Sequence, residues 1–248
     1  MNQQPSYEEL FRLYSVKKTQ VEMLFDRGYI IPPEEKWFLE ISNEEDDELL
    51  EKNINKFYSF YTKLSKKTSK NISPKNIIRS LLSNYYKSPK GEDIYVYFAE
   101  TPDKAKQLSN DIVQLFSQKL TDYNIDRAII ISELNVSSAS QNQIKMLGRD
   151  IQIFIDDQYY NELVYNPTRH TSVIKHVLLS KEKEQKILTE FGIKKGNLQA
   201  IKSTDPIVKY YNFPEGSVIE LHRYDKQNII NKHTINYRVV IKGEKIES

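Results

Sequence analysis

Cysteine is absent from this chain of 248 residues, glycine occurs only seven times, and no hydrophobic run is long enough to span a membrane. Without cysteine, disulfides, thiolate catalysis and cysteine-type zinc sites are excluded. The few glycines form neither a phosphate-binding loop nor a nucleophile elbow. No charged and then apolar leader follows Met1, so the chain is expected to be soluble and unprocessed. The net charge of +2 is too small for a strongly basic nucleic-acid coat.

Residues that could carry catalysis or bind a metal are few. His170 and His176 are six residues apart, which is not a zinc-ligand spacing, so a hydrogen-bonded structural role is preferred to a shared metal. Metal-dependent nucleases place an acid-x-Lys triplet at a strand end, and neither 95–98 nor 128–132 carries one. Glu133 is not followed by such a lysine either. We therefore predict no catalytic residue, no metal site and no cofactor.

Charge is unevenly distributed along the chain. Residues 162–248 carry 15 Lys and Arg against 10 Asp and Glu, whereas residues 1–161 carry 21 against 24. Residues 51–90 hold ten basic residues and one acid, just after the acidic run 44–48. A solvated helix pair with internal charge pairing is the preferred interpretation. The alternative is a phosphate-facing patch formed by Lys63, Lys66, Lys67 and Lys70.

The N-terminal half begins with helical patterns and continues into alternating strands and helices. Ser6 and Glu9 fit a capping box that opens a helix, and Gly28 ends it. A short helix at 34–39 and an amphipathic helix at 49–61 follow, and the tyrosines and phenylalanines of the latter are expected in the core rather than as base-stacking platforms. The spacing of 77–86 allows a helix, but the turn before 94–98 favours a hairpin.

The β-α-β-α-β order of the following elements predicts an α/β sheet. These elements are a helix from Thr101-Pro102 to about Tyr123, a strand at 128–132, a helix at 138–148 and a strand at 151–155. The residues expected to face inward from the first helix are Leu108, Ile112, Leu115 and Phe116. The polar segment 156–161 then marks a boundary, which divides the chain into domains 1–160 and 161–248.

The C-terminal domain is expected to contain two capped helices and a β-hairpin. Ser180 caps a helix with an inward stripe of Ile187, Leu188 and Phe191, and Gly192 ends it. Thr204 or Asp205 caps a short helix in which Pro206 takes the first position. Residues 214–216 form a turn, and strands at 218–221 and 234–241 are joined by a loop at 225–231.

This C-terminal pattern resembles the assembly domain of the fifth subunit shared by the nuclear RNA polymerases, a family that also has archaeal members. The residues that carry the resemblance are Asp205, Pro206, Tyr210, Gly216, Val218, Arg223, Tyr237 and Arg238. Residues 163–182, with His170 and His176, are similar to a strand, paired histidines and a helix start of that family. Residues 25–29, 95–154 and especially 127–131 also resemble it. The chain departs from the family pattern at Ser140, Gln199-Ala200, Asn212, Glu215 and the loop 226–231.

The resemblance implies a non-catalytic polymerase subunit with an α+β or α/β fold. Its N-terminal domain would be jaw-like and restriction-nuclease-like, with helices around a mixed sheet, and its C-terminal domain a small α+β assembly module. The partners implied are the largest polymerase subunit, other polymerase subunits and, weakly and without sequence specificity, downstream duplex DNA. No membrane and no small-molecule substrate is implied. The location would be the nucleus for a cellular enzyme, and the host cytoplasm or the virion for a viral one.

Two sets of site residues follow from the resemblance. The DNA-proximal loop would use Ser137, Ser138, Ser140 and Gln141, with Lys145 and Arg149 as secondary contacts. The assembly interface would use His170, His176, Asp205, Pro206, Tyr210, Gly216, Arg223, Tyr237 and Arg238. Without the resemblance, Arg223 and Arg238 would be interpreted as solvated residues at a strand edge. Tyr210 and Tyr237 could belong equally well to the core or to the interface.

Two other functions are compatible with parts of the sequence. A free-standing, non-specific DNA-binding module of nuclease-like fold without catalysis would bind DNA alone, with a salt dependence of several phosphates. A generic interaction protein unrelated to transcription would leave the long resemblance unexplained.

Overall fold

The computed structural model describes residues 5–40, 47–65, 74–101, 107–155, 161–224 and 233–243. The chain divides into two compact units, Met1–Tyr165 and Asn166–Ser248. The boundary segment expected at 156–161 lies, but for its last residue, outside the described residues, as do most of the acidic run at 44–48 and the loop expected at 225–231. In the described part of the chain, no helix combines the length and the apolar character needed to cross a bilayer.

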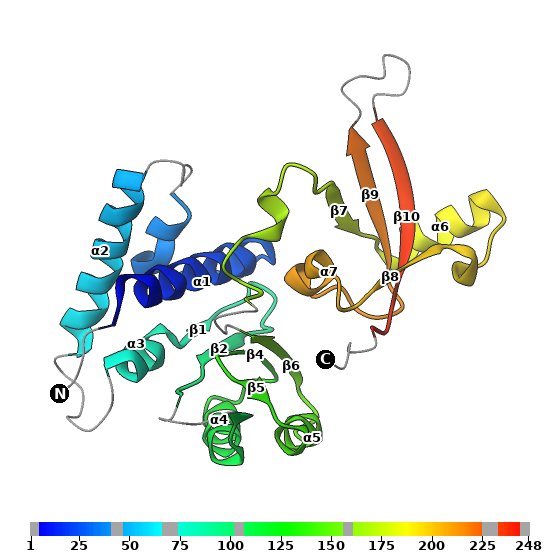
Figure 1. The fold of residues 1–248 in the computed structure, drawn as a ribbon. Helices are drawn as coiled ribbons and strands as arrows, with labels where there is room; N and C mark the ends of the chain where they lie inside the picture. Colours follow the sequence, from blue (N-terminus) through cyan, green and yellow to red (C-terminus); the bar gives the residue numbers. More distant parts are fainter. Residues whose placement is uncertain are drawn as a thin grey trace. The chain divides into compact units, whose positions relative to one another are not determined.

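The first unit is a mixed four-stranded sheet with helices on both faces (Figure 1). Its elements are α1 (Tyr7–Asp26), a 3-10 helix (Pro33–Phe38), α2 (Asp47–Ser65), α3 (Pro74–Leu82), β1 (Asn84–Tyr86), β2 (Ile94–Phe98), β3 (Gln107–Leu108), α4 (Asn110–Asp122), β4 (Arg127–Ser132), β5 (Asn135–Val136), α5 (Ser138–Met146) and β6 (Asp150–Ile155). The sheet order is β1-β2-β4-β6. Strands β2, β4 and β6 are parallel, as the predicted β-α-β-α-β order requires, and β1 joins antiparallel.

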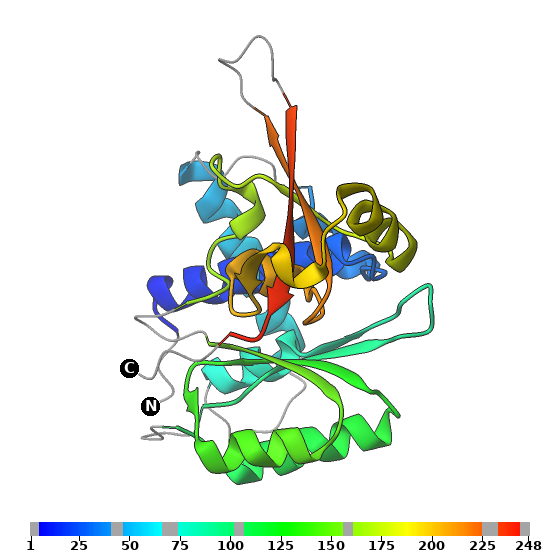
Figure 2. The same ribbon diagram turned by 90° about the vertical axis from the view of Figure 1, so that its right-hand side faces the viewer.

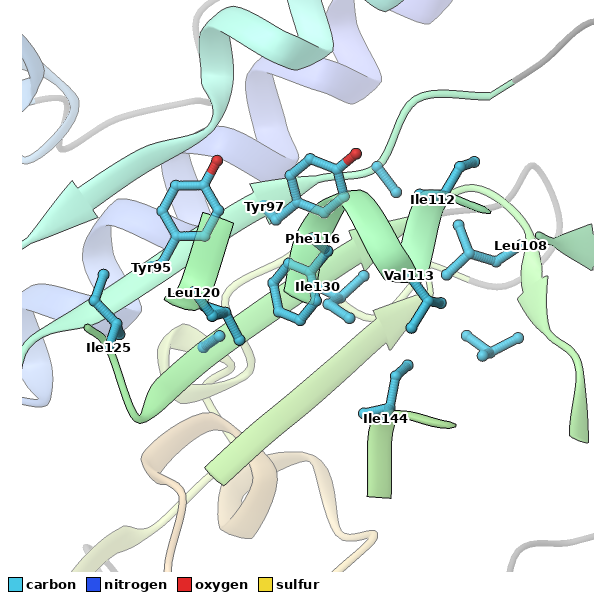
Figure 3. Close-up of a cluster of buried hydrophobic side chains, with 13 residues drawn as sticks. Tyr95, Tyr97, Leu108, Ile112, Val113, Phe116, Leu120, Ile125, Ile130 and Ile144 are labelled. Atoms are coloured by element: carbon cyan, nitrogen blue, oxygen red, sulfur yellow. The ribbon is translucent and has the colours of Figure 1, made fainter. Parts of the chain in front are cut away.

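One hydrophobic core of this unit lies between the sheet and the pair α4 and α5, which run side by side beneath it in Figure 2. Figure 3 shows Tyr95 and Tyr97 of β2 on the same face of the sheet as Ile130 of β4. The ring of Phe116 lies 5.5 Å from that of Tyr97. Because helices cover both faces of this sheet, β2 and β4 are continuous apolar runs rather than alternating ones.

Local signals predicted several elements of this unit correctly. The Ser6 side chain accepts a hydrogen bond from the Glu9 amide, and the Glu9 carboxylate accepts one from the Ser6 amide, so the capping box opens α1. Gly28 follows the helix with a φ of 86°, a left-handed value that glycine adopts without strain. The short helix expected at 34–39 is a 3-10 helix, and α2 is present with Phe57 and Tyr61 in the core.

Three expectations for this unit were wrong. Residues 77–82 belong to helix α3, and only 84–86 pair with β2 as a hairpin, because α3 packs against β2 and its amphipathic pattern outweighs the strand preference. Helix α4 begins at Asn110 rather than near Thr101, and Leu108 lies in β3, paired with β5. Leu115 is 57% exposed because it lies on the outer side of α4.

A fully buried lysine joins three elements of the first unit. The Nζ of Lys17 lies 2.9 Å from Oε1 of Glu35 and 2.8 Å from the hydroxyl of Tyr86, which itself donates to Oε2 of Glu35 at 2.6 Å. Burial lowers the pKa of Lys17, although the Glu35 carboxylate opposes this change. Burial alone would raise the pKa of Glu35, but the Lys17 ammonium and the hydrogen bond from Tyr86 outweigh it and lower the pKa.

The second unit is a four-stranded sheet with the order β7-β9-β10-β8, with α6 and α7 on opposite sides of it (Figure 1). Its elements are a 3-10 helix (Pro167–Arg169), β7 (Lys175–Leu178), α6 (Lys181–Phe191), a 3-10 helix (Lys195–Asn197), β8 (Gln199–Lys202), α7 (Pro206–Tyr211), β9 (Val218–Tyr224) and β10 (His233–Ile241). The predicted hairpin is formed by β9 and β10, which pair antiparallel. The mixed α+β architecture expected for the chain is thus confirmed.

The helix predicted after Ser180 is present, but its expected apolar stripe is not a core. The Ser180 hydroxyl accepts from the Lys183 amide, and Gly192 closes α6 in the left-handed conformation. Ile187 and Leu188 are half-buried, and Phe191 is 55% exposed. The core of the unit instead joins β8, α7, β9 and β10. Its buried members are Ile201, Val208, Ile219, Leu221 and Val240.

Candidate interaction surfaces

Four of the nine expected interface residues maintain the fold of the second unit. Asp205 caps α7, since its Oδ1 accepts from the Ile207 amide at 2.9 Å, and Pro206 occupies the first helical position. Tyr210 is 1% exposed, and its hydroxyl accepts from Nδ2 of Asn166 at 3.1 Å. Gly216 adopts a φ of 76° in the turn before β9. Substitution of these four residues would disturb the fold, whatever partner the unit binds.

The sheet register places three of the remaining residues on one face. Residues opposite each other in antiparallel strands project to the same side. Arg238 is opposite Ile219, and His176 is opposite Leu221, whereas Arg223 lies two residues beyond Leu221 along β9. All three therefore share the face that carries the core, the face covered in part by α7.

The two arginines on this face differ in their surroundings. Arg223 is exposed near the far end of β9. Arg238 is half-buried, and its Nε is buried without a hydrogen-bond partner among the described residues. A buried guanidinium nitrogen without an acceptor costs free energy.

Tyr237 lies on the opposite face from the arginines. Its ring lies 5.9 Å from that of Phe191, at the end of α6. Partial burial raises the pKa of Tyr237, and the nearby carboxylates of Glu220 and Glu190 act in the same direction. The phenol is therefore neutral at physiological pH, and its hydroxyl already interacts with the Glu220 side chain.

His170 and His176 do not form a shared site. Nδ1 of His170 accepts from the Ser172 amide at 3.2 Å, and Nδ1 of His176 lies 2.7 Å from the carbonyl oxygen of Ile174. Each ring therefore supports its own turn, as a structural role requires. No group of three or more histidine, aspartate or glutamate side chains that could hold a metal occurs among the described residues.

In the loop expected near DNA, most polar groups are already bonded within the protein. Ser137 caps α5 by accepting from the Ser140 amide at 3.1 Å. Ser140 is fully buried, with its Oγ 3.0 Å from the carbonyl oxygen of Leu108. Nε2 of Gln141 donates to the carbonyl of Val136 at 3.0 Å. The expectation that the Ser140 hydroxyl reaches a phosphate is corrected, because this hydroxyl ties α5 to the end of β3.

The accessible polar groups of this region lie on α5 itself. Ser138, in the first turn of α5, and Lys145, in the last, are exposed. Arg149 is half-buried, and its Nη1 donates to the carbonyl of Ile125 at 2.6 Å. Of the six residues expected here, Ser138 and Lys145 are the ones that the structure leaves most open to a phosphate.

A buried carboxylate follows strand β4, where a nuclease would carry an acid. Oε1 of Glu133 lies 2.9 Å from Nη1 of Arg79 and 2.8 Å from Nη2 of Arg12. The Thr101 hydroxyl donates to its other oxygen at 3.0 Å. Arg79 is completely buried, and its Nε donates to the carbonyl of Ala99 at 2.8 Å. The cluster thus fastens α1 and α3 to the carboxyl ends of β2 and β4.

Sequence reasoning missed these buried charges, although a signal was present. Lys17 stands between Tyr14 and Val21 on the helix, and Arg79 interrupts the apolar residues of α3. A charge on an apolar helical face indicates either a break in the pattern or a buried ion pair. The partner could not be read from the sequence, since Glu133 is 54 residues away from Arg79.

Comparison with known proteins shows which proteins this chain resembles. Residues 165–240 match the family described as RNA polymerase Rpb5, C-terminal domain, a range that lies almost entirely within the second unit. Relatives match most of the chain. The chain is therefore similar to the Rpb5 family in its C-terminal part and to RNA polymerase subunits along most of its length, in line with the resemblance.

Three relatives illustrate the similarity. The chain is 26% identical to the DNA-directed RNA polymerases I, II, and III subunit rpabc1 of Dictyostelium discoideum, over 87% of this chain and 92% of the relative. It is 26% identical to the DNA-directed RNA polymerase subunit 5-like protein 1 of Arabidopsis thaliana, over 90% and 93%. It is 23% identical to subunit RPABC1 of the same three polymerases in Caenorhabditis elegans, over 94% and 97%.

Proposed function

We propose that the chain is a non-catalytic structural subunit of a multisubunit DNA-directed RNA polymerase. The observation that carries this proposal is the similarity to named polymerase subunits along nearly the full length of both chains. The residues of the first unit add physical support, because Glu133 after β4 is held by two arginines and a hydroxyl in a structural cluster. The role of the chain is architectural, through buried surface and placed hydrogen bonds.

The second unit is the assembly module in this proposal, and it docks on the largest polymerase subunit. Arg223 and Arg238 share one sheet face, and the Nε of Arg238 is without an acceptor among the described residues. A guanidinium offers a planar fork that suits a carboxylate or a pair of backbone carbonyls across an interface. Tyr237 on the other face, together with His170 and His176, contributes less, since these groups are already used locally.

The first unit forms part of a jaw near downstream duplex DNA and has a restriction-nuclease-like fold in this proposal. Contact would be made by Ser138 and Lys145 of α5, with Ser137, Gln141 and Arg149 positioning the helix. Contacts of this kind position DNA without reading its sequence. The expected location is the nucleus for a cellular polymerase, in line with its eukaryotic relatives, and the host cytoplasm or virion for a viral one.

The test is recovery of the tagged full-length chain from its native source, followed by mass spectrometry. The double variant Arg223→Ala/Arg238→Ala is compared with Lys186→Ala, which removes an exposed charge from α6. We expect the unaltered chain and the Lys186 variant to recover the two largest polymerase subunits, and the double variant to recover less of them. This result would support both the function and the docking face.

Two other outcomes would change the proposal in different ways. Equal recovery with all three chains would retain the polymerase assignment and move the docking surface away from the arginine face. In the second outcome no polymerase subunit is recovered, and the isolated chain binds duplex DNA with an affinity whose salt dependence corresponds to several neutralised phosphates. That result would replace the proposal with a free-standing DNA-binding module.

A further inference from the structure

Two histidines that belong to neither of the expected sites face each other across the β9–β10 hairpin. His222 lies on β9 opposite Ile235, and His233 lies two residues before Ile235 on β10, so both rings project from the same face of the sheet. Nδ1 of His222 is 3.0 Å from Nε2 of His233. The rings are nearly parallel, with centroids 5.2 Å apart and an interplanar angle of 19°.

The carboxylate of Glu220 fixes the orientation of one of these rings. Its Oε2 lies 3.2 Å from Nε2 of His222, on the same strand and the same face. A carboxylate only accepts hydrogen bonds, so the proton of a neutral His222 is held on Nε2. The lone pair of Nδ1 is then directed toward His233. This carboxylate–histidine arrangement is the one that commonly orients a metal-ligating imidazole.

We propose that His222 and His233 together chelate a divalent transition-metal ion of the kind that prefers imidazole, namely Cu²⁺, Ni²⁺ or Zn²⁺. Two nitrogens that each bind such an ion at about 2.0–2.1 Å lie roughly 2.9–3.4 Å apart for bond angles between a right angle and a tetrahedral one. The observed separation of 3.0 Å falls within this range. Binding replaces the hydrogen bond between the rings, with the proton of His233 moving from Nε2 to Nδ1.

The surroundings of the pair decide how strong such a site can be. The described residues offer no third protein ligand, because the Glu220 carboxylate is turned to the other nitrogen of His222, so water completes the coordination. Lys175 is opposite His222 on β7, but its side chain is exposed to solvent. The negative charge of Glu220 offsets the repulsion between this lysine and a bound cation. The ion would join β9 to β10 and stabilise the hairpin in proportion to its binding.

The experiment uses the full chain, titrated with Cu²⁺ and followed by electron paramagnetic resonance, and with Zn²⁺ followed by thermal unfolding. The variants His222→Ala and His233→Ala are compared with His170→Ala and His176→Ala, which remove the other two histidines of the chain. We expect binding at least tenfold weaker in the first two variants, together with loss of the spectrum of two coordinated nitrogens. The two control variants should bind as the unaltered chain does.

Glu220 is a positioning residue in this proposal, and two substitutions test it separately. Glu220→Ala should weaken binding while leaving two nitrogens in the copper spectrum, and Glu220→Gln should restore much of the affinity, because the amide oxygen still accepts from Nε2. Circular dichroism establishes that each variant is folded. If all four histidine variants bind equally well, or lose binding equally, the metal is adventitious and the proposal is overturned.

Discussion

The two units of this protein are held together in different ways. The first unit buries ionisable side chains, with Lys17 and Arg79 completely excluded from solvent and paired with carboxylates on distant segments. In the described part of the second unit even the most buried charged residue, Glu184, retains 9% exposure, and the buried residues are mostly apolar. The second unit therefore depends on backbone pairing, helix caps and a small core.

The difference teaches where each unit obtains its specificity. A buried ion pair contributes little net stability relative to an apolar pair, but removal of one partner is strongly unfavourable, so it specifies which segments must meet. A small unit with a small core is marginal by itself and gains from docking on a larger partner. The small core of the second unit thus fits the assembly role proposed for it.

The largest effect is expected from Arg79→Met in the first unit. The change removes one of the two guanidinium groups that neutralise the buried Glu133 carboxylate, and also the hydrogen bond to the Ala99 carbonyl. We therefore expect a loss of about 3–5 kcal/mol in the free energy of unfolding. Urea unfolding followed by the fluorescence of Trp37, the single tryptophan, reports on this unit. The control is Arg127→Met, which removes an exposed pair with Glu92 and should cost less than about 1 kcal/mol. Equal losses would show that the buried arginine of the first unit contributes no more to stability than an exposed one.

The second largest effect is expected from Ile219→Ala, in the core of the second unit. Ile219 has no exposed surface, and the cavity left by the substitution should cost about 3 kcal/mol. Hydrogen exchange of the β9 and β10 amides should accelerate, while the Trp37 transition stays in place. Ile235→Ala is the control, because this side chain is 39% exposed and its removal should change the stability by less than about 1 kcal/mol. A shift of the Trp37 transition by Ile219→Ala would show that the units do not unfold separately.

A smaller effect is expected at the cap of α7. Asp205→Ala removes the acceptor for the Ile207 amide and should cost about 1 kcal/mol, again measured by exchange in the second unit. Asp205→Asn keeps an oxygen acceptor and should lie close to the unaltered chain. If the two substitutions cost the same, the charge of Asp205 rather than its hydrogen bond would be the stabilising factor.

The smallest effect at neutral pH concerns the tyrosines beneath the sheet of the first unit. Burial raises the pKa of Tyr95 and of Tyr97 to about 12 from an ordinary value of 10.0. Their raised values stabilise the folded state fully below pH 10, and this stabilisation is lost as the pH rises toward 12. The urea concentration at the midpoint of unfolding should fall between pH 10 and pH 12. It should fall less steeply in the double variant Tyr95→Phe/Tyr97→Phe than in the unaltered chain. Tyr165→Phe, at an exposed position, should leave the slope unchanged.

The sequence predicted the parts of the fold that depend on neighbouring residues. The Ser6–Glu9 capping box, the Asp205-Pro206 helix start and the turn at Gly216 each involve contacts over two or three positions. It failed at 77–82 and at Leu108, where the outcome depends on packing against the sheet and on pairing with β5. Local preference at these places was compatible with more than one structure, and tertiary contacts selected between them.

The amino-acid sequence by itself determined most of the strands and helices, the capped ends and the resemblance to a known family, because these follow from periodicity, turn residues and motif spacing. The tertiary structure alone decided which polar residues are open to a partner. Ser140 and Tyr210 turned inward, Arg223 and Arg238 came to share a sheet face, and His222 met His233. Such outcomes depend on strand register and on contacts between distant segments, which local patterns do not encode.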